Sequence, residues 1–191
     1  MVSDANLQSL SGYLKQLEKD HTIPPLEKWN PEYCGEMDLV IKANGEWWHE
    51  GSPIRRQNMI DLFSRVLWKE EGSYYLKTPV EKIKIQVEDA PLLVTQVDQI
   101  EIDGQTYLQF TTQTQDVIVA DQQHPVFIRR YVDETGESEE RPYIKVRFGL
   151  DALIQRQVFY HLVNYGELFD ELHGTCLKLH SGTTQFTLYM E

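Results

Sequence analysis

The pair Asn44-Gly45, set between two apolar stretches, restricts the local chain more than any other feature of this 191-residue sequence. A two-residue type I′ turn needs positive φ at both central positions, and Asn followed by Gly tolerates that conformation best. Strands are therefore expected on both sides of the pair, over residues 38–42 and through Trp47, Trp48 and His49. The chain is expected to fold with a β-hairpin here.

A helix is expected directly after this hairpin, ending near Leu67. Ser52 is the predicted N-cap, and Pro53 suits the first helical position because proline has no N–H to lose there. Arg56, four residues before Ile60, then falls on the apolar face in the first turn, where the helix dipole disfavours a cation. We expect Arg56 to meet either a carboxylate of the chain or a ligand anion such as phosphate.

The rest of the chain alternates mostly between apolar and polar residues, which is typical of half-buried strands. Two further helices are predicted. One is a leucine stripe after Asp4, ending before Pro24, and the other runs from Leu150 to about Tyr165. Strands are predicted at 83–87, 92–102, 107–110, 117–120, 125–131, 143–148, 175–179 and 185–190.

Two short segments resemble each other, Ile54-Arg55-Arg56-Gln57 and Ile154-Gln155-Arg156-Gln157. Each lies at or in a predicted helix that follows a hairpin ending in glycine, and this shared order indicates a duplication. The predicted fold class is α+β with duplicated hairpin-helix-strand units. The N-terminal domain is expected over 1–78 and the C-terminal domain over 79–191, with a ligand cleft between the halves.

Charge and motifs exclude several function classes. The net charge of −12, from 18 basic and 30 acidic residues, argues against a nucleic-acid or anionic-membrane partner. No glycine-rich nucleotide loop or nucleophile elbow is present, so no cofactor is predicted. Two cysteines form no disulfide framework, and no apolar run is long enough to span a bilayer. A cytoplasmic protein is expected.

The candidate ligand residues are of types that recognise anions and bases, and each has a plainer structural alternative. Trp47 on a hairpin usually packs in the core, and charged residues at strand ends often pair with one another. His173, Cys176 and His180 supply too few ligands for a zinc site. The candidates are Arg56, Arg156 and Lys82 for phosphate, Thr78 for a hydrogen bond, Trp47 or Tyr160 for stacking, and Glu81 and Asp89 for orienting the cations or binding ribose hydroxyls.

The sequence resembles the DUF1285 family of bacterial proteins of unknown function. The segments that carry the resemblance are Cys34-Gly35, Asn44-Gly45 with Trp47, Gly51–Ile54 with Arg56, Leu62-Phe63, Tyr75–Lys82, Val87–Pro91, Arg147–Leu150 and Ala152–Arg156 with Phe159-Tyr160. The resemblance implies a duplicated α+β fold whose second half is similar to a pleckstrin-homology-like barrel. It also implies an interdomain site for a nucleotide-like ligand and a role in signal transduction. Leu92 stands where the family favours Phe, so a stacking role is not carried over to it.

Three functions remain open at this point. The first is a non-enzymatic sensor that binds a small anionic ligand, for which a nucleotide is one candidate. The second is a protein-docking module that uses exposed strand edges. The third is a hydrolase that uses Asp89 or Glu81 with a metal, although no ligand spacing supports it.

Overall fold

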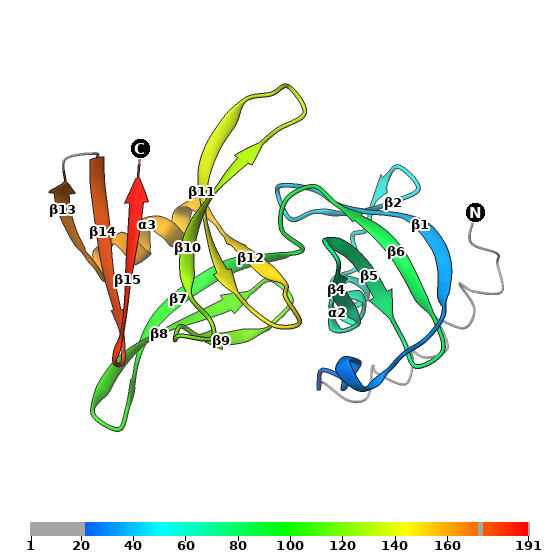
Figure 1. The fold of residues 1–191 in the computed structure, drawn as a ribbon, viewed down its shortest axis with the longest axis horizontal. Helices are drawn as coiled ribbons and strands as arrows, with labels where there is room; N and C mark the ends of the chain where they lie inside the picture. Colours follow the sequence, from blue (N-terminus) through cyan, green and yellow to red (C-terminus); the bar gives the residue numbers. More distant parts are fainter. Residues whose placement is uncertain (1–21, 172–173, 191) are drawn as a thin grey trace. The chain divides into compact units, whose positions relative to one another are not determined.

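The computed structural model describes residues 22–171 and 174–190. They form two compact units, each of which can be followed by its colours in Figure 1. The first unit runs to Ala90 and also includes Phe148–Leu150, and the second comprises Pro91–Arg147 and the chain from Asp151 onward. The helix expected after Asp4 lies outside the described residues.

The described part of the first unit is a mixed sheet with one α-helix. Its strands follow the order β3-β2-β1-β6-β5-β4, in which two antiparallel meanders are joined by the parallel pair β1 and β6. Its described elements are η1 (Leu26–Lys28), β1 (Tyr33–Ile41), β2 (Trp47–His49), β3 (Ser52–Pro53), α2 (Gln57–Arg65), β4 (Leu67–Glu70), β5 (Ser73–Lys77) and β6 (Lys82–Val87).

The core of the first unit lies between one face of this sheet and α2. Alternate residues of the strands are buried there, among them Leu39, Leu76 and Ile83. The Trp47 ring stacks on Phe63 of α2, with ring centroids 6.2 Å apart. The period-2 pattern predicted for residues 83–87 is confirmed, because Ile83 and Ile85 point into this core while Lys82 and Lys84 do not.

The hairpin at Asn44-Gly45 is confirmed, but its turn type is different. Lys42 N–H donates to the Glu46 carbonyl over 2.8 Å, and Gly45 N–H donates to the Lys42 carbonyl over 2.9 Å. The loop therefore has three residues, and Gly45 takes the left-handed conformation with φ of 86°. A three-residue loop of this kind needs positive φ at one position only, which explains why glycine is placed last.

The predicted start of the next helix was wrong. Ser52 and Pro53 form the short strand β3, which pairs with β2 after a turn at Glu50-Gly51, where φ is 49° and 71°. Two consecutive left-handed residues make a tight hairpin, and this turn outweighs the local capping signal. Helix α2 begins at Gln57 with Arg56 as its N-cap, so Arg56 is exposed before the first turn and does not lie on the apolar face.

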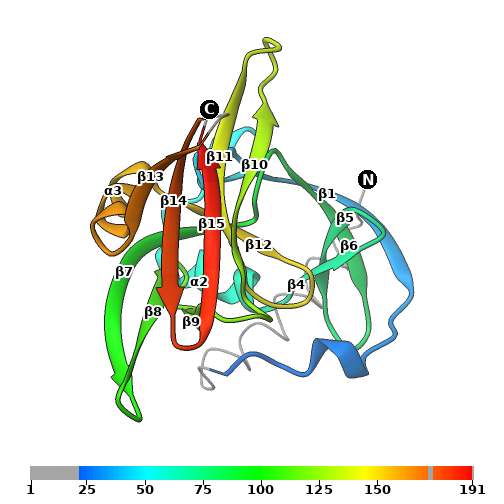
Figure 2. The same cartoon turned by 60° about the vertical axis from the view of Figure 1, so that its left-hand side comes forward.

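The second unit contains a six-stranded sheet, a separate meander and one helix. The large sheet follows the order β10-β11-β12-β7-β8-β9, and β13, β14 and β15 form the meander, which is seen most clearly in Figure 2. Its elements are β7 (Leu92–Ile102), β8 (Gln105–Thr112), β9 (Val117–Val119), β10 (Val126–Val132), β11 (Ser138–Lys145), β12 (Asp151–Ile154), α3 (Arg156–Asn164), β13 (Glu167–Glu171), β14 (Gly174–Ser181) and β15 (Thr184–Met190).

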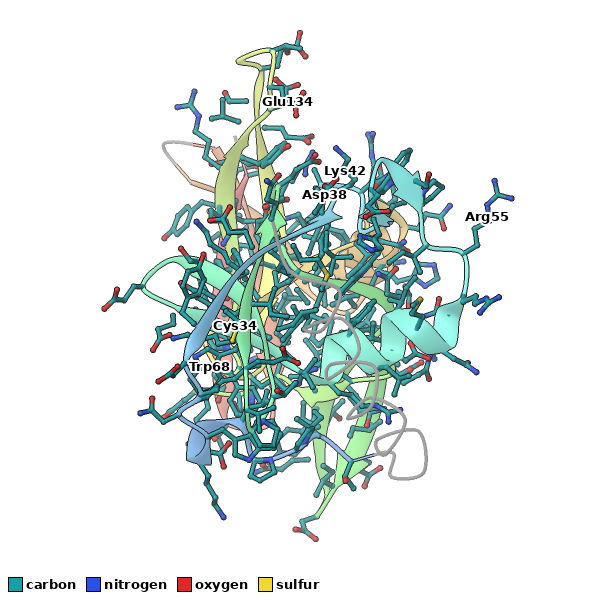
Figure 3. All side chains as sticks on the ribbon, turned by 90° about the vertical axis from the view of Figure 1, so that its right-hand side faces the viewer. Cys34, Asp38, Lys42, Arg55, Trp68 and Glu134 are labelled. Atoms are coloured by element: carbon teal, nitrogen blue, oxygen red, sulfur yellow. The ribbon has the colours of Figure 1, made fainter. Side chains whose placement is uncertain are left out.

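The buried hydroxyl of Ser181 ties the meander to the large sheet. It donates to the Ala120 carbonyl over 2.6 Å and accepts from Leu108 N–H over 3.0 Å. The β10–β11 hairpin extends away from the other strands of this unit, with Glu134 near its tip (Figures 1 and 3).

The helix predicted from Leu150 to about Tyr165 begins later in the structure. Residues 151–154 form β12, which pairs with β11 on one side and runs parallel to β7 on the other. Three of these four residues are buried, and a short buried run shows no period that separates strand from helix. Helix α3 begins at Arg156, with Gln155 as its N-cap.

The two large sheets have the same topology, strand for strand. Strands β7 to β12 repeat the pairings of β1 to β6, including the parallel contact between the first and the sixth strand. A duplicated two-domain architecture therefore fits, and the fold is mostly β. The repeating element is the sheet and not the predicted hairpin-helix-strand unit, because α2 follows the third strand whereas α3 follows the sixth. Arg56 and Arg156 consequently occupy different places in the repeat.

The boundary between the units follows from the same pairing. Lys82–Val87 pair with both β1 and β5, which makes β6 the sixth strand of the first sheet. Along the chain the first unit runs to Ala90 and the second begins at Pro91, whereas the predicted boundary follows residue 78.

Candidate functional site

Five residues form a group on the outer face of the first sheet, which we call the first cluster: Trp68, Glu70, Tyr75, Lys77 and Lys82. Trp68 lies opposite Tyr75, and Lys77 lies opposite Lys82. Since alternate residues of a strand share a face, all five point away from the apolar core.

The cations of the first cluster lie over its aromatic rings. Lys77 Nζ is 3.9 Å from the centre of the Trp68 ring, and Lys82 Nζ is 5.1 Å from the centre of the Tyr75 ring. Lys82 also forms an ion pair with Glu70. The Trp68 ring, labelled in Figure 3, contacts Phe148 of the same unit at a centroid distance of 5.3 Å. The cluster therefore joins two ammonium groups, one carboxylate and an aromatic surface.

Lys77 is the unusual member of the first cluster. Only 6% of the residue is exposed, and this burial lowers the pKa of its ammonium group. Glu70 raises the pKa, Lys82 lowers it and Glu27 raises it, all through longer-range charge interactions. Among residues 22–171 and 174–190, no carboxylate lies within ion-pair distance of Lys77 Nζ. At short range, Lys77 Nζ lies against the Trp68 ring.

The indole N–H of Trp68 adds a second donor at the same place. Its Nε1 atom is buried and has no acceptor in the part of the chain that the structure describes. A buried donor without an acceptor is costly, and each such group in a folded protein needs an explanation. Lys77 and Trp68 together present two donors and no acceptor.

The second sheet carries an equivalent group, the second cluster: Phe127, Arg129, Tyr143, Lys145 and Asp151. Phe127 lies opposite Tyr143, and Lys145 lies opposite Asp151. The guanidinium of Arg129 is 4.0 Å from the centre of the Tyr143 ring, and Lys145 Nζ is 5.6 Å from that of Phe127. Asp151 accepts from Arg129 over 2.9 Å and from Lys145 over 3.2 Å.

The clusters correspond position by position, with one exchange of charge. An aromatic residue on the fourth strand, a tyrosine on the fifth and a lysine at the end of the fifth are common to both. Each cluster has an ion pair between the fourth and sixth strands, but the charges are exchanged. In the first cluster Glu70 on the fourth strand pairs with Lys82 on the sixth, and in the second Arg129 on the fourth pairs with Asp151 on the sixth. As a result, Lys145 reaches a carboxylate on the sixth strand, whereas Lys77 faces Lys82.

Some of the predicted ligand residues lie at the first cluster. Lys82 is a member, and Thr78 and Glu81 form the turn that connects it to Lys77. The Thr78 hydroxyl accepts from Glu81 N–H over 3.1 Å and donates to the Glu81 carbonyl over 3.3 Å, so it is used within its own turn. Both Thr78 and Glu81 are buried. Trp47 is 1% exposed and belongs to the core, which excludes it as an open platform for a base.

The other predicted residues lie elsewhere. Arg56 is exposed at the start of α2, and the neighbouring Arg55 projects away from the ribbon (Figure 3). Asp89 is half-buried in the connection after β6. In the second unit, Arg156 Nε donates to the Tyr160 hydroxyl over 3.0 Å, and both side chains are exposed. The interdomain site built from these residues stays a prediction.

Lys77 and Trp68 were missed by the sequence analysis, although a signal for them exists. The tripeptides Tyr75-Leu76-Lys77 and Tyr143-Ile144-Lys145 match, and each follows a strand that begins with an aliphatic and an aromatic residue. The Ile-x-Arg-Gln match does not mark equivalent positions, because α2 follows the third strand of its sheet whereas α3 follows the sixth.

Metal chemistry and membrane crossing receive no support from the described residues. Within them, no group of three or more His, Cys, Asp or Glu side chains is placed to hold a metal ion. None of the helices in that part of the chain is long and apolar enough to cross a bilayer.

Comparisons with known proteins give a consistent result. Residues 24–90 match the domain of unknown function (DUF1285), N-terminal domain, and residues 91–188 match the protein of unknown function (DUF1285), C-terminal domain. A DUF1285 family protein from Silicibacter pomeroyi DSS-3 is 37% identical with a TM-score of 0.76, over 93% of this chain and 94% of that one. A DUF1285 family protein from Shewanella baltica OS155 is 28% identical with a TM-score of 0.49, over 67% of this chain and 91% of that one. No curated protein matches the chain.

Proposed function

The chain belongs to the DUF1285 family, and from this premise we propose that it is a non-enzymatic protein that binds a small anionic ligand. One observation carries the proposal. At equivalent positions of two equivalent sheets, Lys145 has a carboxylate partner and Lys77 has none within the described residues. A lysine whose side chain is largely buried normally has a carboxylate partner, so one without such a partner, beside a second donor, favours an anion from outside.

The same proposal has a finer form. In that form the ligand is nucleotide-based, binds between the two units, and gives the protein a role in signal transduction. Exposed Arg56 and Arg156 support this form, since a guanidinium suits a phosphate group. The second unit would be pleckstrin-homology-like, which its strand-rich composition with a single nine-residue helix supports.

A thermal-shift screen of the full chain tests the proposal. Acetate, benzoate, phosphate, AMP and ATP are compared at equal ionic strength, with chloride as the reference. A ligand that binds the folded state alone must raise the melting temperature as its concentration exceeds its dissociation constant. If none of these anions gives a saturable shift, the proposal falls. Arg56→Ala and Arg156→Ala decide the finer form, because both variants should lose the response to nucleotides.

Protein docking through strand edges is the second candidate function. The edge strands β9, β10 and β13 of the second unit each carry an exposed apolar residue, namely Val117, Val132 and Leu168, with exposures of 61%, 55% and 55%. Unpaired strand edges can accept an added strand from a partner. Under this function Val132→Lys would abolish partner binding and leave the response to anions unchanged.

A further inference from the structure

We propose that Lys77 and Trp68 form the binding site for one oxyanionic group that carries a single negative charge, such as a carboxylate. This inference rests on the proposed function in its general form and deepens it, because it names the site and the chemical class of the group that binds there. It is an alternative to the nucleotide form of that proposal. It concerns the first cluster only and requires nothing of the second unit.

The two donors suit a group with at least two acceptor oxygens. Lys77 Nζ lies 3.9 Å above the centre of the Trp68 ring, and the indole N–H lies at the edge of that same ring. One oxygen of a carboxylate or phosphate group can accept from Lys77 Nζ, and the other can accept from the indole N–H once the atoms that cover Nε1 move aside. Hydrogen bonds in which donor and acceptor are both charged are short and about twice as strong as neutral ones.

The charge of the first cluster sets the charge of the group. Two lysines and one carboxylate leave a formal charge of one positive unit, and Lys82 is already paired with Glu70. A single negative charge would balance the cluster, whereas a triphosphate would bring several charges into a place with one free cation among the described residues. The contact of Trp68 with Phe148 adds apolar surface beside the donors, which favours a ligand with an apolar body next to its anionic group.

Indole N–H resonances offer a direct test, since the chain has four tryptophans and Trp68 is one of them. The full chain is labelled with ¹⁵N at its indoles, Trp68→Phe assigns the signal, and acetate, benzoate, phosphate and ATP are titrated. Benzoate should move the Trp68 signal downfield in a saturable way and bind more tightly than ATP. Trp47 is the matched control, because its Nε1 is also buried without an acceptor in the described residues and no lysine is recorded over its ring.

Lysine variants complete the test. Lys77→Met should weaken benzoate binding at least tenfold, the size expected for losing a charged hydrogen bond. Lys145→Met, at the equivalent position of the second sheet, should leave binding unchanged. If anions stabilise the protein but the Trp68 signal does not move, or Lys77→Met binds as well as the parent, this site is wrong while anion binding stands. If no anion stabilises the protein, both proposals fall.

Discussion

The two clusters place the same side chains on the same strands and differ in where the carboxylate lies. In the second unit Asp151 is on the sixth strand, directly opposite Lys145, and it accepts from both Arg129 and Lys145. In the first unit Glu70 is on the fourth strand and pairs with Lys82. Lys77 is left with the ring of Trp68.

The difference separates a structural role from a binding role. Asp151 is buried and its two cations are half-exposed, so the second cluster satisfies its charges within the protein. In the first cluster the carboxylate Glu70 is exposed and the lysine Lys77 is buried, which is the opposite arrangement. A lysine that lies over an aromatic ring is stabilised less than one paired with a carboxylate. Lys77 can therefore still gain favourable free energy by binding an anionic ligand.

The largest expected effect is the loss of the shared carboxylate. Asp151→Asn leaves Arg129 and Lys145 facing each other, and should lower the free energy of unfolding by about 2 kcal/mol, because solvent still screens the two cations. Glu70→Gln, the equivalent removal in the first unit, should cost about 0.5 kcal/mol because Glu70 is 46% exposed. Urea denaturation followed by far-UV circular dichroism measures both. Equal costs would remove the contrast between the clusters.

Exchanging the charges should convert one cluster into the other. Glu70→Arg combined with Lys82→Asp puts a carboxylate opposite Lys77, as Asp151 lies opposite Lys145. We expect benzoate binding to weaken at least tenfold, because the new carboxylate competes for the ammonium group. The double variant should remain folded, since the ion pair is only reversed. Unchanged binding in a folded double variant would show that Lys77 does not hold the anion.

Removing the ammonium of Lys77 should stabilise the first unit. Lys77→Met keeps the long apolar stem and removes a partly desolvated charge, and should raise the free energy of unfolding by about 0.5 kcal/mol, because the ammonium keeps some contact with solvent. Lys145→Met removes an exposed charge that has a partner, and should lower it by about 0.5 kcal/mol. All four tryptophans belong to the first unit, so their intrinsic fluorescence in urea measures the unfolding of that unit in Lys77→Met and in the parent. A loss of stability in Lys77→Met would indicate that the ammonium is already satisfied.

The smallest effect is a dependence on pH. The pKa of Lys77 is lowered below 10.5 in the folded state, so between these two values the unfolded state binds more protons. Stability should therefore rise as the pH rises through this window, and Lys77→Met should lack that component. Glu70, Lys82 and Glu27, whose charges also act on Lys77 in the folded state, are unchanged in the variant. Urea denaturation of both proteins from pH 7 to 10 measures it. The excess in free energy of unfolding of Lys77→Met over the parent should shrink across this range, and an excess that grows with pH would contradict the lowered pKa.

Local patterns predicted much of the fold and little of the candidate site. The hairpin at residues 44–45 and the alternation at residues 83–87 are confirmed because turn chemistry and period-2 burial act within a few residues. The predictions for Ser52-Pro53 and for residues 151–154 were wrong. Ser52-Pro53 pair with the adjacent strand β2 across the tight turn at Glu50-Gly51, whereas residues 151–154 pair with β7, which is distant in the sequence. Of the predicted ligand residues, Lys82 lies in the first cluster, whereas Trp47 is enclosed by the core.

The amino-acid sequence by itself determined the family, the β-rich character and the presence of two related halves, since these follow from local periodicity and from motifs along the chain. Only the tertiary structure decided which residues are equivalent between the halves. Lys77 and Lys145 look alike in sequence, and each follows Tyr by two positions. What distinguishes them is the residue opposite on the sixth strand, Lys82 or Asp151, and strand pairing alone brings that residue within reach.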